Sequence, residues 1–431
     1  MSKRTKNKYV LLNGFKKIIN LNFELFIAKR IISGEKYKNS ISSPIIKIAV
    51  TAIALGIAIM LIAVSTAAGL QLKIRDKMAG FKGHIQIVNF DANNSDVSTT
   101  PIKKNQEFYP NFKDVTGIKN VQIFANKAGI LRTETDFEGI IFKGVSTDYD
   151  WSFFEEYLVE GKVPNLNQSR NTQILLSETL VNSLQLQLND TILATFIKSE
   201  ESKLPSNRKY IISGIYNTGF AQFDKNMMIG DIKEVQNLNN WSENEIGGFE
   251  IILENFEEIS IKGEQIYSEI DSTLNSKTIV EMYPSIFEWI QLFDNNVWFI
   301  IAIMILIAGI NMITALLVLI LERVQMIGIL KALGSNNYSI QKIFLYNAST
   351  LILKGLFWGN LIGLSLIGIQ HFFKVITLNP ETYYVATMPV SISFLTLILL
   401  NIGTLICCFL MLIIPSFIVA KINPSKSIKF A

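Results

Sequence analysis

The sequence predicts a membrane protein with four transmembrane α-helices and a large α+β extracytoplasmic domain between helices 1 and 2. Of its 431 residues, 49% are hydrophobic and 18% are charged, and the mean hydropathy is +0.31. Lys/Arg and Asp/Glu number 11 and 2 in residues 1–47, 21 and 32 in 71–296, and 8 and 2 in 297–431. This basic–acidic–basic order, interrupted by long uncharged runs, excludes a soluble globular protein and gives nucleic acid no extended basic face.

Four stretches without a charged residue are long enough to cross a bilayer, which takes roughly 20 apolar residues. They are residues 48–70, 297–321, 355–373 and 390–420. Pro415 predicts a bend or an end in the last stretch. The basic segment 1–47 and the apolar run after it are both too long for a cleaved signal peptide, so the first stretch is predicted to be a retained anchor.

The distribution of Lys and Arg sets the predicted orientation. Residues 1–47, the loop 322–354 and the tail 421–431 carry most of the flanking positive charge and are expected in the cytoplasm. Residues 71–296 and the short loop 374–389 are then outside, and both termini are cytoplasmic.

Strand and helix patterns mix in residues 71–296, which predicts an α+β domain. Strands are expected at 84–89, 130–145, 191–198, 209–216 and 249–253. Helices are expected at 177–186, 257–274 and 285–296, and polar loops at 91–105 and 200–207. The domain contains no cysteine, so disulfides do not hold it together.

The sequence carries no motif for a catalytic, metal or cofactor site. It has two histidines, no His-Glu-x-x-His or Gly-x-Ser-x-Gly pattern, and no Gly-rich phosphate loop ending in Gly-Lys-Ser/Thr. Cys407 and Cys408 both fall in the fourth span, where packing is the expected role. Any energy-requiring work therefore needs another chain as its source of energy.

The loop after the second span predicts a short amphipathic helix. Met326, Ile327, Leu330 and Leu333 recur at helical spacing, Gly334 stands at the C-cap, and residues 335–337 can start the next helix. Two interpretations remain open on these residues: a helix that lies in the lipid headgroups, or a helix that fills a groove in another protein.

Small residues and an amphipathic segment mark two further features. Gly355, Gly359 and Gly363 recur every four residues in the third span, and the first span offers Ala52 with Gly56 and Ala54 with Ala58. Such spacing predicts close packing within the helix bundle, with a dimer or gate interface as the alternative. Residues 22–33 predict an interfacial helix on the inner face, or a plain basic anchor.

Taken together, the chain resembles the FtsX-like/MacB-type ABC transporter permeases, and within them most the lipoprotein-releasing (Lol) branch. The order of one span, a large exported domain and three spans is similar to theirs. The resemblance is carried by the loop Glu322–Gly334 and by four stretches: Phe26–Arg30, Gly80–His84, Pro380–Pro389 and Pro415–Pro424.

The resemblance implies a bacterial inner-membrane permease that works as a dimer, with a second copy or a sister permease. It implies a partner cytoplasmic ABC ATPase that binds ATP-Mg, while this chain binds no cofactor and is no enzyme. ATP-driven movement would reach the exported domain by mechanotransmission. The ATPase-coupling residues would be Glu322, Arg323, Met326, Ile327, Gly328, Leu330, Lys331, Leu333 and Gly334.

For the Lol branch, the resemblance implies a lipoprotein cargo that passes to a periplasmic lipoprotein carrier. Candidate cargo contacts are Ile57, Met60, Leu61, Val64, Phe299, Ile303 and Met304. A candidate carrier hook comprises Lys203, Leu204, Pro205, Ser206, Asn207 and Arg208. Lipid-facing helix surface and a plain surface hairpin are the respective alternatives.

Two other functions fit the same family. One is a MacB-like exporter of drugs, peptides or toxins, and the other is a non-transporting FtsX-like regulator of a cell-wall hydrolase. A neighbouring gene for a periplasmic adaptor and tunnel protein favours the first, and a gene for a coiled-coil hydrolase favours the second.

Overall fold

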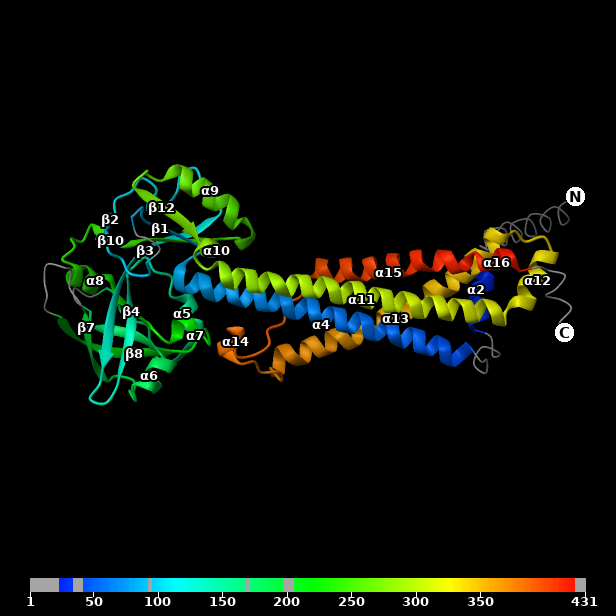
Figure 1. The fold of residues 1–431 in the computed structure, drawn as a ribbon, viewed down its shortest axis with the longest axis horizontal. Helices are drawn as coiled ribbons and strands as arrows, with labels where there is room; N and C mark the ends of the chain where they lie inside the picture. Colours follow the sequence, from blue (N-terminus) through cyan, green and yellow to red (C-terminus); the bar gives the residue numbers. More distant parts are fainter. Residues whose placement is uncertain (1–22, 34–41, 92–94, 168–170, 197–204, 423–431) are drawn as a thin grey trace, which may run out of the picture. The chain divides into compact units, whose positions relative to one another are not determined.

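The computed structural model describes residues 23–33, 42–91, 95–167, 171–196 and 205–422 (Figure 1). The chain divides into two compact units. The helical unit draws on residues 1–68, 293–373 and 390–431, and the sheet unit comprises residues 69–292 and 374–389.

The helical unit confirms the predicted four long apolar helices. They are α4 (Ser42–Lys82), α11 (Pro284–Glu322), α13 (Asn337–Phe373) and α15 (Phe394–Ser416), the last followed by the short α16 (Ile418–Lys421). By length and composition each of the four can cross a membrane. Two shorter helices, α2 (Phe23–Ser33) and α12 (Val324–Ala332), complete the described part of this unit.

The helices differ in extent from the uncharged stretches that predict them. α4 begins before residue 48 and continues past residue 70, and α11 begins well before residue 297. The predicted loop 322–354 is mostly helical, because α13 already starts at Asn337. The stretch 390–420 is helical only from Phe394, where Ser393 caps the helix, and α15 ends one residue after Pro415, as predicted.

The glycines of α13 lie directly against α4. A Cβ atom at Gly355 would stand 2.7 Å from Ile53 Cβ, one at Gly359 2.7 Å from Ala54 O, and one at Gly363 2.9 Å from Leu61 Cδ1. These distances leave no room for a side chain, so the two backbones approach closely through the glycine stripe. On α4, Ala52 is half-buried, whereas Gly56 lies beside Met304 of α11.

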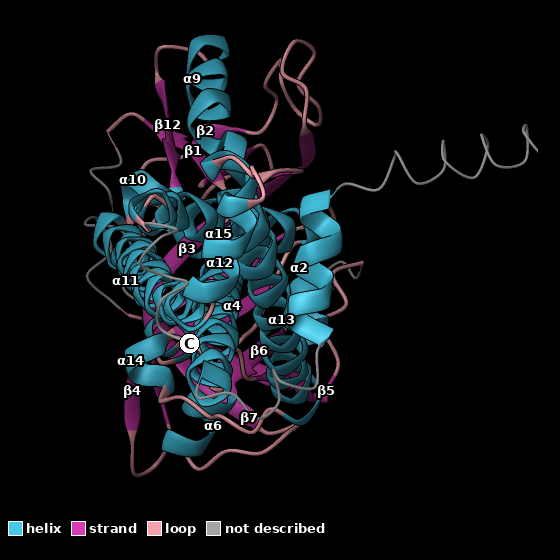
Figure 2. Ribbon diagram, turned by 90° about the vertical axis from the view of Figure 1, so that its right-hand side faces the viewer, coloured by secondary structure: helices cyan, strands magenta, loops and turns pink. Residues whose placement is uncertain are grey.

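Polar side chains join α13 to α15, and α2 adds a further layer. The amides of Asn360 and Asn401 donate to each other, with N–O distances of 2.6 and 2.9 Å. Such reciprocal pairs satisfy polar groups that lipid cannot. Figure 2 shows α2 beside α13, where Ala28 is buried against Ile343.

The sheet unit is built on a mixed sheet that closes on itself. Strand β3 (Ile118–Arg132) pairs with β4 (Phe137–Val145), and pairing continues through β9 (Met227–Asp231), β6 (Gln173–Ser177), β8 (Ser206–Tyr216) and β7 (Thr191–Phe196) back to β3. The first half of β3 extends this ring through β11 (Gly248–Leu253), β1 (Ile85–Asn89) and β12 (Leu274–Thr278). The β4–β9 and β6–β8 pairs are parallel and the others are antiparallel.

Short elements complete this unit. The strands β5 (Leu158–Gly161), β2 (Ile102–Lys103) and β10 (Glu245–Ile246) lie at its margins. The helices are α5 (Ser152–Glu156), α6 (Glu178–Ser183), α7 (Ala221–Asp224), α8 (Ile232–Asn239), α9 (Ile259–Glu269), α10 (Ile279–Met282) and α14 (Pro380–Tyr383), with a 3-10 turn, η1 (Phe256–Glu258).

Aromatic side chains fill the closed part of the sheet. Phe142, Phe196 and Tyr210 are almost fully buried, and the ring centres of Phe142 and Tyr210 are 5.4 Å apart. Burial alternates along β7: Ile192, Ala194 and Phe196 are buried, and the residues between them are not. Period-two burial of this kind is what an alternating sequence predicts.

The α+β prediction is confirmed, with corrections to individual elements. The stretch 130–145 is a hairpin whose first strand starts at Ile118, and 257–274 divides into α9 and the start of β12. Residues 102–103 and 206–207 lie in strands instead of the predicted loops. β6 and β9 carry no predicted strand.

We predict opposite effects for two glycine substitutions in the same helix. Gly359→Ala should destabilise the protein, because its Cβ would overlap α4, and such overpacking costs about 1–3 kcal/mol. Gly368→Ala should be neutral or stabilising by up to about 1 kcal/mol, because apart from the backbone of its own helix no atom lies within 4 Å of a Cβ there. Thermal unfolding of both purified variants in detergent measures the difference. Equal midpoints would contradict the packing of α13 on α4.

Candidate functional site

The first candidate site is the short helix α12, whose ends are fixed by local hydrogen bonds. Gly334 has a φ of +92°, its N–H donates to Lys331 O at 3.0 Å, and Ser335 N–H donates to Leu330 O at 3.0 Å. This is a Schellman motif, which confirms the predicted glycine C-cap. Asn336 caps the next helix by accepting from Ser339 N–H at 2.8 Å, so a sharp turn joins α12 to α13.

The apolar residues of α12 divide between two faces. Ile327 and Gly328 are buried, and Met326 and Leu330 are half-buried against the cluster that contains Ile343 of α13. Leu333 and Ile329 are exposed, at 78% and 48%. Tyr338, close by in the sequence, is 65% exposed. The predicted coupling set is therefore not one outward surface: its inner members hold α12 in place, and the outward surface includes Ile329, which helical spacing alone does not single out.

Lys331 also faces its own chain. Its Nζ donates to Val419 O at 2.8 Å, to Ala420 O at 3.2 Å and to Ile422 O at 2.8 Å. A lysine ammonium has three N–H donors, and three backbone carbonyls engage them here. Lys331 thus binds its own chain, and its role among the ATPase-coupling residues stays a prediction.

The remaining predicted residues of this region flank α12. Glu322 ends α11 and is exposed, and Arg323 is half-buried at the start of α12, with a buried Nε that has no hydrogen-bond partner. α2 lies alongside, where Glu24 Oε1 accepts from Ser339 Oγ at 2.6 Å. Phe23, Leu25 and Phe26 of α2 stay more than two-fifths exposed, as suits a helix at a membrane interface.

Residues 1–22 and 423–431, with most of the predicted tail, lie outside the described residues.

The candidate cargo contacts do not form one surface. Ile57, Met60 and Leu61 are fully buried in the helix bundle, and Val64 and Met304 are half-buried. Phe299 and Ile303, at 68% and 54% exposure, face outward from α11. A cavity that used all seven would require the helices to separate, so their role as cargo contacts stays a prediction.

The second candidate site is the place where α4 ends in the sheet unit. Lys143 Nζ lies 2.6 Å from Phe81 O and 2.7 and 2.8 Å from the two carboxylate oxygens of Glu250. Lys143 and Glu250 are each 1% exposed in their side chains. Gln86 and Gln122 donate to the same carboxylate at 3.1 and 3.0 Å. Burial lowers the pKa of Lys143, and the partner carboxylate opposes that effect.

This cluster fixes the last turn of α4. Phe81 O is one of the carbonyls at the helix end that lack a partner within the helix, and the ammonium of Lys143 supplies one. The next residue, Lys82, is 2% exposed and pairs with Asp96 at 2.7 Å. The sequence gives no signal for the cluster, because residues 143 and 250 come from distant strands.

The loop between α13 and α15 packs on the same unit through Tyr384. Its ring lies 4.9 Å from that of Phe220 and 5.6 Å, edge to face, from that of Trp289 in α11. Its carbonyl accepts from Nζ of the buried Lys77 of α4 at 2.9 Å. One tyrosine thus contacts α4, α11 and the sheet domain.

Asp224 lies close to this junction. It is 2% exposed, and its Oδ1 accepts from Thr218 Oγ1 at 2.7 Å. Burial raises the pKa of Asp224 to about 6, although the hydrogen bond and the neighbouring Lys77 oppose the shift. His84 is half-buried, accepts from Leu253 N–H at 2.9 Å, and has its pKa lowered by desolvation to about 4.

The candidate carrier hook lies only partly within the described residues. Lys203 and Leu204 are outside them, and Pro205 is exposed. Ser206, Asn207 and Arg208 belong to β8 and pair with Phe196, Thr195 and Ala194 of β7. Ser206, Asn207 and Arg208 therefore belong to the paired strands β7 and β8, and the role of the segment as a hook stays a prediction.

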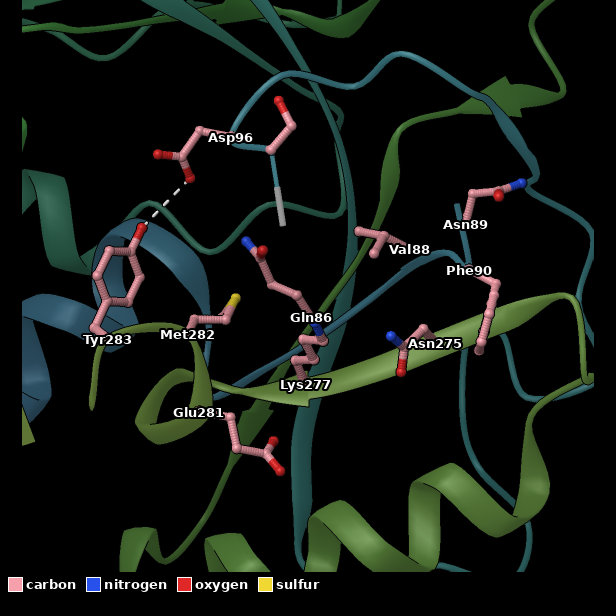
Figure 3. A pocket seen from close by; sticks show the side chains of 11 residues that line it. Gln86, Val88, Asn89, Phe90, Asp96, Asn275, Lys277, Glu281, Met282 and Tyr283 are labelled. Carbon is pink, nitrogen blue, oxygen red and sulfur yellow. Dashed lines mark hydrogen bonds between the residues drawn. The ribbon is translucent and has the colours of Figure 1, made fainter. Parts of the chain in front are cut away.

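A polar cavity of about 450 Å³ lies beside β1 and β12 (Figure 3). The polar groups that line it are largely engaged: Tyr283 OH donates to Asp96 at 3.4 Å, Gln86 binds Glu250, and Glu281 caps α10 through Thr278. Within the described ranges, no group of three or more His, Cys, Asp or Glu side chains is arranged to hold a metal ion.

Comparison with known proteins matches most of the chain. Residues 48–267, which are half of it, match the family described as MacB-like periplasmic core domain, and residues 298–424 match the FtsX-like permease C-terminal family. The lipoprotein-releasing system transmembrane protein LolC of Buchnera aphidicola subsp. Schizaphis graminum is 22% identical over 89% of this chain and 92% of its own length. LolC of Neisseria meningitidis serogroup B is 20% identical over 95% and 99%. The LolE protein of Haemophilus influenzae is 19% identical over 94% and 99%.

Among solved structures, the periplasmic region of MacB from Actinobacillus actinomycetemcomitans aligns over 47% of this chain and 91% of its own, with 15% identity and a TM-score of 0.32. The extracellular domain of the transporter YknZ from Gram-positive bacteria aligns over 45% and 99%, with 13% identity and a TM-score of 0.30.

We predict a pH dependence that comes from Asp224. Between its ordinary pKa of 3.8 and about 6, the folded protein keeps the proton that the unfolded chain releases, so folding becomes more favourable as pH falls through this window. From pH 7 to pH 5, this amounts to about 1 kcal/mol. Asp224→Asn should remove that part of the pH dependence and still accept from Thr218.

Thermal unfolding of wild type and Asp224→Asn is measured at pH 5 and pH 7. The change in stability between the two pH values is compared for the two proteins, so that the contributions of other carboxyl groups cancel. Asp114→Asn, at an exposed position, is the control and should behave as wild type. Identical pH dependence in wild type and Asp224→Asn would contradict the assignment.

Proposed function

Because the chain belongs to the family of permeases that join a MacB-like periplasmic core domain to an FtsX-like permease C-terminal region, we propose that it releases lipoproteins from the inner membrane. It is a permease subunit of the ABC transporter type, in a family whose ATPase is a separate protein. The partner ATPase binds ATP-Mg, and hydrolysis there drives the transfer of a lipoprotein to a periplasmic carrier. The permease works beside a second copy of itself or a sister permease.

The observation that carries the lipoprotein assignment is full-length similarity to the Lol proteins. The relatives from Buchnera, Neisseria and Haemophilus align over at least 92% of their own lengths, so the match includes both the membrane helices and the exported domain. A match confined to either part would support the permease class alone.

The geometry of α12 supports its role as the contact to the ATPase. Ile329 and Leu333 expose apolar side chains on a helix that is fixed to α13 and α2 by its buried face. An exposed apolar helix face beside a rigid support suits docking into a groove of another protein. Force applied to α12 then reaches the helix bundle through contacts already made.

The ends of the long helices support mechanotransmission to the exported domain. α4 is one uninterrupted helix from Ser42 to Lys82, and Lys143 and Glu250 hold its last turn in the sheet unit. α11 is likewise uninterrupted from Pro284 to Glu322. Movement of either helix along its axis is therefore passed to the residues that bind its end, and no channel through the bundle is required.

Depletion with complementation tests the proposal. Loss of the chain in its own organism should leave lipoproteins in the inner-membrane fraction, and wild type should restore their release. Leu333→Asp should fail to restore release and should co-purify roughly tenfold less ATPase, because burying an unpaired carboxylate in an apolar contact costs at least ~1.4 kcal/mol. Gln325→Ala, exposed on the same helix, should behave as wild type.

Two results would contradict the proposal. Normal lipoprotein sorting after depletion would remove the lipoprotein assignment and leave the permease class standing. Undiminished co-purification of the ATPase with Leu333→Asp would remove α12 as the docking helix.

A further inference from the structure

The contact between Lys331 and the end of the fourth span joins two segments that are almost ninety residues apart. Lys331 lies in the last turn of α12, and its three carbonyl partners are Val419, Ala420 and Ile422. Two of these bonds are 2.8 Å long, which is the normal length for a charged donor. The side chain is half-buried, in keeping with a group that faces its own protein.

The acceptors are carbonyls at the end of the fourth span, and one of them, Val419 O, also accepts from Ile422 N–H at 3.4 Å. Pro415 and the break at Phe417 end α15, and α16 continues for one short turn only. The last carbonyls of a helix have no donor within the helix, and the negative end of its dipole attracts a cation. Lys331 supplies both a donor and a charge at this point.

Apolar packing holds the same two segments together. Ile327 of α12 and Val419 of α16 are both fully buried and belong to one hydrophobic cluster. Packing alone allows two surfaces to slide, whereas hydrogen bonds from one ammonium to three carbonyls fix their register. The outward residues Ile329 and Leu333 take no part in this contact and stay available.

We propose that Lys331 is a positioning residue that couples movement of α12 to the fourth membrane helix. The inference rests on the proposed function, in which an ATPase moves α12. It adds a route for that movement, from α12 through the Lys331 ammonium to α16 and α15. Binding of the ATPase does not require Lys331, because its donors are directed at its own chain.

The test uses the full complex of permease, ATPase and lipoprotein in nanodiscs, with three measurements: the amount of bound ATPase, the rate of ATP hydrolysis, and ATP-dependent release of lipoprotein to a carrier. For Lys331→Met, the amount of bound ATPase should stay within about twofold of wild type, while the rate of release falls roughly tenfold. A tenfold change is typical of the coupling between two sites of a protein. Lys331→Arg should keep most of the release, because guanidinium also donates to several carbonyls. Lys354→Met, at an exposed lysine of α13, should match wild type.

Chemical rescue separates coupling from folding. In a chain with Cys407→Ala and Cys408→Ala, Lys331→Cys should release lipoprotein poorly, and alkylation with bromoethylamine, which rebuilds a lysine-like ammonium, should restore release in the same sample. The cysteine-free parent, treated identically, should not change.

Several results would overturn the inference. The first is a rate of lipoprotein release by Lys331→Met within twofold of wild type. The second is that Lys331→Met loses bound ATPase together with release. The third is that Lys331→Cys does not recover release after complete alkylation. A wild-type complex without bound ATPase would overturn the proposed function itself, and this inference with it.

Discussion

The place where α4 ends in the sheet unit depends on one buried ion pair, Lys143–Glu250. Taking Lys143 and Glu250 out of water costs several kcal/mol for each charge, and only complete pairing offsets that cost. The pairing here is complete on both sides: the ammonium binds both carboxylate oxygens and Phe81 O, and two glutamine amides bind the carboxylate. Because a helix carbonyl is part of the set, the ion pair can be satisfied only when α4 ends at this point in the sheet.

That requirement gives the long helices a defined attachment. α4 ends in the ion-pair cluster, and Tyr384 binds α4, α11 and the sheet domain through one carbonyl and one ring. In the helical unit, the glycine stripe and the Asn360–Asn401 pair leave little freedom for α13 to slide against α4 and α15. Lys331 plays a similar part where α12 meets α16. Polar bonds to helix ends therefore occur at two places that the proposed mechanism uses, Phe81 O at the end of α4 and the carbonyls of α16.

The features that follow a local or periodic rule could be predicted from the sequence. The four spans, the α+β class, the end of α15 after Pro415 and the cap at Gly334 all depend on nearby residues. β6 and β9 could not be predicted, because their residues are buried on both faces and so lack alternation. The partners of the Lys331 side chain and the division of α12 into a buried and an exposed face could not be predicted either. Helical spacing shows which residues lie on the same face of a helix, but it does not show which other element packs against that face. The Lys143–Glu250 pair depends on distant strands meeting, which no local pattern records.

Hydrogen exchange of the full-length protein with Lys143→Met tests the central claim most directly. Removing one partner of a buried ion pair costs about 3–5 kcal/mol, which corresponds to roughly a hundredfold or greater change in local opening. The account predicts that backbone amides of residues 78–85 in and after the last turn of α4, and of 248–253 in β11, exchange faster together by about that factor, while amides in α13 do not change. Unchanged protection of the end of α4 would contradict the claim that this ion pair holds the helix in the sheet unit.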